Sequence, residues 1–155
     1  TVGRDAALDK RALGAGDGSV DDAARRRDAA AGEGTVFAPQ LLRMQRAAQQ
    51  FVGTHDFAAV RSQGTPVKST VRTIFWCDVD KVDDLIRIRV CGDGFLYNMV
   101  RIIAGTLLEI GQGKYPPGEI TAILRSEDRE RAGKTASACG LYLERVFYEQ
   151  KEAEL

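Results

Sequence analysis

Arg101 is the residue of this sequence whose setting most directly suggests chemistry. It follows the largely apolar stretch of residues 95–100, so a permanent cation stands where a buried helix face is expected. A guanidinium near a core needs a carboxylate or phosphate partner, because an unpaired buried charge is very costly. The partner is either an Asp or Glu of this chain or an anion supplied from outside it. The residues alone leave both interpretations open.

Other patterns that resemble chemical motifs fail on spacing. Residues 111–114 end like a phosphate-binding loop, but Leu108 and Tyr115 stand where that loop needs Gly and Ser or Thr. The four aspartates of residues 78–84 lack the Gly and Glu of a calcium loop. His55 is the only histidine, which favours a capping or core role over catalysis. We therefore predict no metal site.

Composition sets the class of protein. The chain has 155 residues, with 22 basic side chains against 22 acidic ones, and 44% of its residues are hydrophobic. This balance excludes a histone-like protein but not a local basic groove. No apolar run approaches the length of a membrane span. We therefore predict no membrane partner. Three cysteines without a C-x-x-C spacing favour a reducing, cytoplasmic setting.

The N-terminal part of the chain differs from the rest. Residues 1–34 contain nine Ala and six Gly and no aromatic residue, so they have little apolar surface to bury. We predict a low-complexity tail over residues 1–36, disordered or weakly helical. The folded unit is predicted over residues 37–150, followed by a short C-terminal tail over residues 151–155.

Hydrophobic periodicity predicts the elements that position Arg101. A spacing of three and four indicates helices, and alternation in which Phe75, Cys77 and Val79 share a face indicates a strand. The predicted order is helix, strand, strand, helix, helix, strand, which is an α+β fold with an antiparallel sheet covered by helices on one face. The predicted ranges are 40–52, 71–79, 85–90, 96–110, a short helix after residue 117, and 141–148.

Five blocks in order resemble the tRNA pseudouridine synthase A family. They are residues 51–57, 71–74, 95–107 with 111–114, 128–136 and 140–143. The resemblance covers only the C-terminal half of that family. It implies an RRM-like lobe, one of two that share a sheet and enclose an RNA-binding cleft. It also implies isomerisation of uridine to pseudouridine in the anticodon stem-loop of tRNA, without cofactor, by a homodimer.

The resemblance assigns roles to particular residues. Arg101 would pair with the catalytic aspartate. Leu143, which follows Gly140 in its block, would pack against the target uracil, and Phe95 and Tyr97 would line or support the same region. Candidates for contacts with RNA phosphates are Lys68, Arg72, Arg87, Arg89 and Lys114.

The family's catalytic aspartate lies in a G-R-T-D-A-G-V-H block, and no such block occurs here. The nearest sequence, residues 3–7, lacks the Thr before Asp5. We therefore predict a truncated chain that is inactive alone. Its origin is left open between a gene fragment, a shifted reading frame at the start of the gene and a genuinely short protein. The alternative functions are a stand-alone RNA-binding module and a dimerisation module without catalysis.

Overall fold

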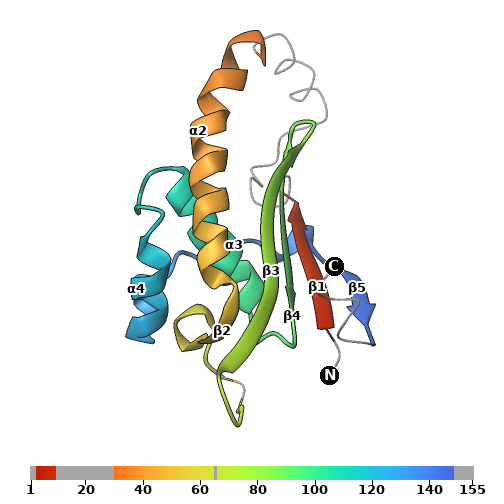
Figure 1. Cartoon of the computed structure of the whole chain (residues 1–155), viewed down its shortest axis with the longest axis vertical. Coiled ribbons are helices and arrows are strands. Elements are labelled where there is room, and N and C mark those ends of the chain that lie inside the picture. The colour runs from red at the N-terminus through yellow and green to blue at the C-terminus, as the bar shows by residue number, and fades with distance from the viewer. Residues whose placement is uncertain (1–2, 10–29, 65, 149–155) are drawn as a thin grey trace.

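The computed structural model describes residues 3–9, 30–64 and 66–148, with residues 3–9 and 30–38 described by their backbone. Three helices lie together on one side of a single sheet (Figure 1). The arrangement confirms the predicted α+β class with an antiparallel sheet and helices. The elements are β1 (Gly3–Asp9), α2 (Ala30–Ala48), β2 (Gly53–Asp56), β3 (Val71–Val82), β4 (Leu85–Gly92), α3 (Met99–Gly111), α4 (Glu119–Ser126) and β5 (Leu141–Phe147).

The sheet has the strand order β2-β3-β4-β1-β5, and every neighbouring pair is antiparallel. The chain passes from β1 through α2 to β3, and from β4 through α3 to β5. Each crossover leaves a third strand between the two strands that it connects, which is the split βαβ arrangement. The helices of both crossovers therefore cover the same face and enclose the core against it.

The structure differs from the sequence prediction at the N-terminus. Residues 3–9 form β1, between β4 and β5, with Asp5 in register with Cys91 on one side and Arg145 on the other. The prediction of a disordered or weakly helical tail is wrong for these residues. The last part of the predicted tail is helical, because α2 begins at Ala30. A central strand is held by backbone hydrogen bonds on both sides, and composition says little about these. Residues 10–29 and the predicted tail over 151–155 lie outside the described residues.

A bulge in β3 decides which side chains enter the core. The β3–β4 hairpin is confirmed, with Cys77 opposite Val90, and its register shifts between Ile74 and Trp76. Ile74 is therefore buried with Cys77 under the helices, whereas Phe75 and Trp76 pack in a second cluster. The predicted alternation, with Phe75 on the face of Cys77, is wrong because one extra residue reverses the side-chain pattern.

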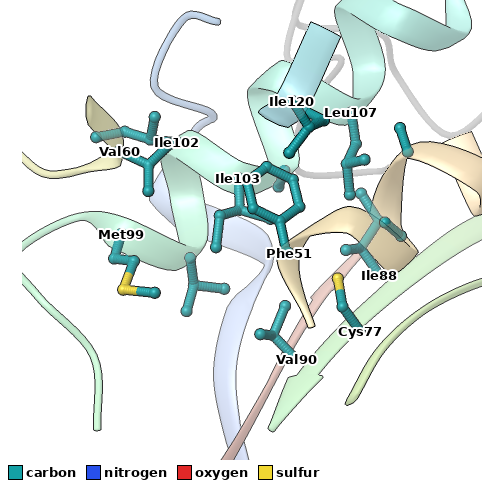
Figure 2. Packing of buried hydrophobic residues seen from close by; sticks show 14 of the residues in the cluster. Phe51, Val60, Cys77, Ile88, Val90, Met99, Ile102, Ile103, Leu107 and Ile120 are labelled. Atoms are coloured by element: carbon teal, nitrogen blue, oxygen red, sulfur yellow. The ribbon is translucent and has the colours of Figure 1, made fainter. Parts of the chain in front are cut away.

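The core lies between α2, α3 and the sheet. Figure 2 shows Phe51 beside Ile103, above Val90 and Cys77 of the sheet. The segment predicted as a helix over residues 96–110 buries the apolar residues that recur along it at helical spacing. All of them are at most 5% exposed: Leu96, Val100, Ile103, Leu107 and Ile110. None of the described helices combines the length and the apolar character needed to cross a bilayer.

Candidate active site

Arg101 lies in the first turn of α3, and two acceptors hold its half-buried side chain. Its Nε donates to the Ala136 carbonyl oxygen at 2.7 Å, and its Nη1 donates to Asn98 Oδ1 at 3.0 Å. An arginine side chain carries five N–H groups. Two are used in these bonds, and the other N–H groups of the guanidinium have no hydrogen-bond acceptor among the described side chains.

Both bonds of the guanidinium go to neutral oxygens. Among the side chains that the structure describes, no carboxylate forms an ion pair with Arg101. The first interpretation from sequence, a salt bridge within the chain, therefore finds no partner in residues 39–64 and 66–148. A fixed guanidinium without a carboxylate is suited to receive a planar anion from outside this part of the chain.

Asn98 connects Arg101 to a distant loop. It is the residue before α3, and its Nδ2 donates to Ser62 Oγ at 3.0 Å. The backbone N–H of Ser62 donates in turn to the Tyr97 carbonyl at 3.0 Å. These bonds fix the start of α3 against the loop after Val60.

Residues 132–136 pack directly on α3, on the other side of Arg101. The approach requires a residue without a side chain, because a Cβ on Gly105 would lie 1.7 Å from the Lys134 carbonyl oxygen. Thr106 is fully buried, and its hydroxyl accepts from the Gly133 N–H at 2.9 Å and donates to the Ile102 carbonyl at 2.7 Å. The 132–136 segment therefore keeps a fixed position along the helix.

Arg129 fixes the shape of the 132–136 segment through two hydrogen bonds. Its Nη1 donates to the Gly133 carbonyl at 3.0 Å and its Nη2 to Thr135 Oγ1 at 3.1 Å. Asp128 caps the short turn that carries Arg129 by accepting from the Glu130 N–H at 2.9 Å. Together these bonds fix the shape of the segment that presents the Ala136 carbonyl to Arg101.

The predicted uracil-contacting residues occupy different environments. Leu143 lies on β5 with 60% of its surface exposed, and Tyr97, just before α3, is 55% exposed. Gly140 is buried at the start of β5, and Phe95 is half-buried against the core. The segment that begins at Ala136 leads directly into the block containing Leu143. Two exposed apolar side chains therefore flank the chain segments that hold Arg101.

Three of the five phosphate candidates are already paired with acids. Arg87 Nε donates to Asp80 Oδ1 at 3.0 Å, and this hydrogen bond holds the pKa of the Asp80 carboxyl below its ordinary value. Arg89 lies 3.7 Å from a carboxylate oxygen of Asp78 and stacks over Trp76. Each of these two arginines therefore already faces an acid of its own chain.

The third paired candidate is Lys114, whose Nζ lies 3.0 Å from Glu109 Oε1. Hydrogen bonds to Glu109 and then to Tyr115 raise the pKa of the lysine above its ordinary value. Lys114 thus forms its ion pair with a carboxylate near the C-terminal end of α3.

Lys68 and Arg72 have no carboxylate partner among the described side chains. Arg72 Nη1 donates to the carbonyls of Ser69 at 2.9 Å and Val71 at 2.6 Å, so backbone oxygens hold it. Lys68 is exposed in the same loop. The 68–72 segment therefore carries two cations that no described carboxylate neutralises.

Sequence reasoning singled out Arg101 but missed the residues that hold it. Neither Asn98 nor Thr106 received a role, although both lie in or beside the helix that carries Arg101. The available signal was the polar character of these two residues inside an apolar helical stretch. The Ala136 carbonyl has no sequence signal, because every residue provides the same backbone acceptor.

Comparison with known proteins extends this description of the site. Residues 47–149 match the family model described as tRNA pseudouridine synthase. A tRNA pseudouridine synthase A of Acetivibrio thermocellus is 54% identical over 105 residues, which cover 68% of this chain and 43% of the relative. The protein of that name from Bacillus subtilis is 49% identical over 106 residues, which cover 68% of this chain and 43% of that relative.

A third protein of that name, from Staphylococcus aureus, is 43% identical over 120 residues, covering 76% of this chain and 45% of the relative. The chain thus spans less than half the length of these curated relatives. The matched segment contains Arg101, both segments that hold it and all of β5. On this evidence the chain belongs to the tRNA pseudouridine synthase A family.

Proposed function

We propose that this chain forms the C-terminal lobe of an enzyme that isomerises uridine to pseudouridine in the anticodon stem-loop of tRNA. The observation that carries the proposal is the guanidinium of Arg101, which neutral oxygens fix in place and no described carboxylate neutralises. Such a group is prepared for an aspartate from another lobe. Membership of the family and the names of the relatives support the same reaction.

In the proposed mechanism the aspartate comes from an N-terminal lobe, and Arg101 binds and orients it. The carboxylate acts as a nucleophile or stabilises the sugar after the uracil is detached. After the nucleotide has been flipped out of its stack, the bond from the sugar to N1 of uracil breaks, the base rotates, and its C5 bonds to the sugar. C5 then loses its proton and N1 takes one up. The exposed Leu143 packs against the base, with Tyr97, Phe95 and Gly140 supporting this region. The reaction requires no cofactor.

The proposal also covers the partners of the enzyme. The cations of the 68–72 segment bind RNA phosphates, because an uncompensated charge gains more from a phosphate than one already held by a carboxylate. Arg87, Arg89 and Lys114 contribute less, since each faces an acid of its own chain. The complete enzyme acts as a homodimer in the cytoplasm.

Mixing the chain with the N-terminal lobe of a close relative tests this function. An unmodified tRNA transcript is incubated with the chain, with the lobe or with both, and pseudouridine is counted at each position. We expect turnover only in the mixture, with Arg101→Ala abolishing it. Arg125→Ala is the matched control, because this exposed arginine lies on α4 rather than in the site.

Two results would contradict the proposal. One is pseudouridine formation by the chain alone, and the other is full activity of the Arg101→Ala mixture. Salt-dependent tRNA binding without any restored turnover would instead support the RNA-binding module.

A further inference from the structure

Asn98 has an unusual backbone for its position. It precedes the first residue of α3 with φ 58° and ψ 8°, the left-handed conformation that L-residues other than Gly rarely adopt. Asparagine before a helix usually has extended backbone and accepts a hydrogen bond from an N–H of the first turn. Here its side chain makes no such capping bond. The amide of Asn98 is therefore available for hydrogen bonds to groups outside the first turn of α3.

Two hydrogen bonds use the polar atoms of the Asn98 amide. Its Oδ1 accepts from Arg101 Nη1 at 3.0 Å, and its Nδ2 donates to Ser62 Oγ at 3.0 Å. Both functional groups of the amide are thus used, one on the guanidinium and one on an anchoring loop. Strain of this kind persists where the surrounding structure imposes it, often at functional sites.

We infer that Asn98 is a positioning residue that orients the Arg101 guanidinium toward its carboxylate partner, an inference that rests on the proposed function. The Ala136 carbonyl holds Nε, and Asn98 holds Nη1. With both atoms fixed, the guanidinium plane cannot turn about the end of its side chain. Because the amide is neutral, it orients the cation without neutralising it, and the charge remains available to the incoming carboxylate.

Two substitutions separate side-chain positioning from backbone strain. Asn98→Ala removes the amide and leaves a side chain at positive φ, whereas Asn98→Gly removes the amide at a φ that Gly adopts readily. In the mixture with the N-terminal lobe, we expect both to lower kcat about 10- to 100-fold. The KM for tRNA should change less than about threefold, because the amide acts on the carboxylate partner of Arg101 rather than on RNA binding.

Glu127→Ala is the matched control. Glu127 is exposed, follows α4 and has φ 55°, so the variant also puts Ala at positive φ beside a helix end. We expect its kcat to equal that of the unmodified chain. A normal kcat for Asn98→Gly would overturn the inference, because the side chain would then be dispensable.

A double-mutant cycle shows whether Asn98 acts through Arg101. In the Arg101→Lys background, whose ammonium cannot reproduce the guanidinium geometry, Asn98→Gly should lower the residual rate by less than about twofold. An undiminished effect in that background would mean that Asn98 acts independently of Arg101, and the inference would be wrong. The unmodified mixture and Arg101→Ala report on the proposed function itself, so the two failures are distinguishable.

Nuclear magnetic resonance of the 155-residue chain provides a readout that needs no activity. The Nε–H of Arg101 donates to Ala136, so its exchange with water should be slow. We expect Asn98→Gly to speed this exchange at least about tenfold by freeing the guanidinium. Unchanged exchange would contradict a positioning role even if kcat falls.

Discussion

Arg101 and Ala136 are joined by two hydrogen bonds of opposite direction. The arginine Nε donates to the Ala136 carbonyl at 2.7 Å, and the Ala136 backbone N–H donates to the Arg101 carbonyl at 3.0 Å. Both the side chain and the backbone of Arg101 are therefore tied to the segment that leads into β5. The position of the guanidinium depends on how closely this segment packs against α3.

Gly105→Ala tests that packing. The new Cβ would lie 1.7 Å from the Lys134 carbonyl oxygen, a backbone atom, so the segment must move away from α3. We expect the free energy of unfolding to fall by about 1–3 kcal/mol or more, as measured by urea denaturation. The control is Gly118→Ala, because a Cβ there meets nothing within 4 Å. Equal stability of the two variants would show that the segment is not held as described.

Lys68→Ala and Arg72→Ala should weaken tRNA binding through phosphate contacts. Neither cation has a described carboxylate partner, so each variant should lower the slope of log affinity against log salt by about 1. Filter binding at several salt concentrations measures this slope. The charge-neutral double variant Arg87→Ala with Asp80→Ala should leave the slope unchanged. If the double variant changes the slope more than Lys68→Ala, the assignment of phosphate contacts is wrong.

Asp80→Asn should affect stability in a pH-dependent way. The hydrogen bond from Arg87 lowers the pKa of the folded Asp80 carboxyl from its ordinary 3.8. Because this pKa is lower in the folded chain, the ionised carboxylate stabilises the fold at pH values above the pKa of the unfolded chain. That stabilisation is lost as the pH falls through the pKa of the folded chain. Both side chains are more than one third exposed, so the effect at neutral pH should be small.

Thermal unfolding at neutral pH and at about pH 2 tests this expectation. The difference between Asp80→Asn and the unmodified chain should vanish at the lower pH. Asp84→Asn, in the exposed turn of the hairpin, is the control, because Asp84 forms no ion pair with any described side chain. If the difference in unfolding temperature between Asp80→Asn and the unmodified chain grew as the pH fell, the stabilising role of the ionised Asp80 carboxylate would be contradicted.

The three cysteines should differ in reactivity. Burial, followed by the nearby charge of Asp78, raises the pKa of the Cys77 thiol to about 12, and Cys91 is also buried. Cys139 is exposed. Because the thiolate is the reactive form, we expect one fast-reacting thiol in the folded chain and three after denaturation. The Cys139→Ser variant should lose the fast phase, and rapid labelling of Cys77 in that variant would contradict the described core.

Much of the fold follows from local patterns in the sequence. The apolar spacing of α3 and the alternation around the β3–β4 hairpin predicted both elements, because burial on one face leaves a period in the sequence. The bulge between Ile74 and Trp76 leaves no such pattern in the sequence, so the face of Phe75 was predicted wrongly. A bulge responds to sheet twist and partner register, which involve residues distant in the chain.

Strand β1 is a second feature that local sequence patterns did not predict. The composition of residues 1–34, rich in Ala and Gly with few large apolar residues, predicted a tail there. The strand lies between β4 and β5, where both of its edges are paired. Its environment comes from strands more than 75 residues away in the sequence, as the pairing of Ala6 with Val90 shows. A local pattern cannot contain that information.

By itself, the sequence determined the class of the fold, the family resemblance and the identity of Arg101 as the unusual residue. Arg101 could be recognised because an ionised side chain among apolar neighbours is apparent from the order of the residues alone. Tertiary structure alone decided what holds the guanidinium. The two acceptors are an amide on a strained residue and a backbone carbonyl 35 positions away. Hydrogen bonds of this kind depend on distance and direction between segments, and these are set only when α3, the 132–136 segment and the sheet have packed together.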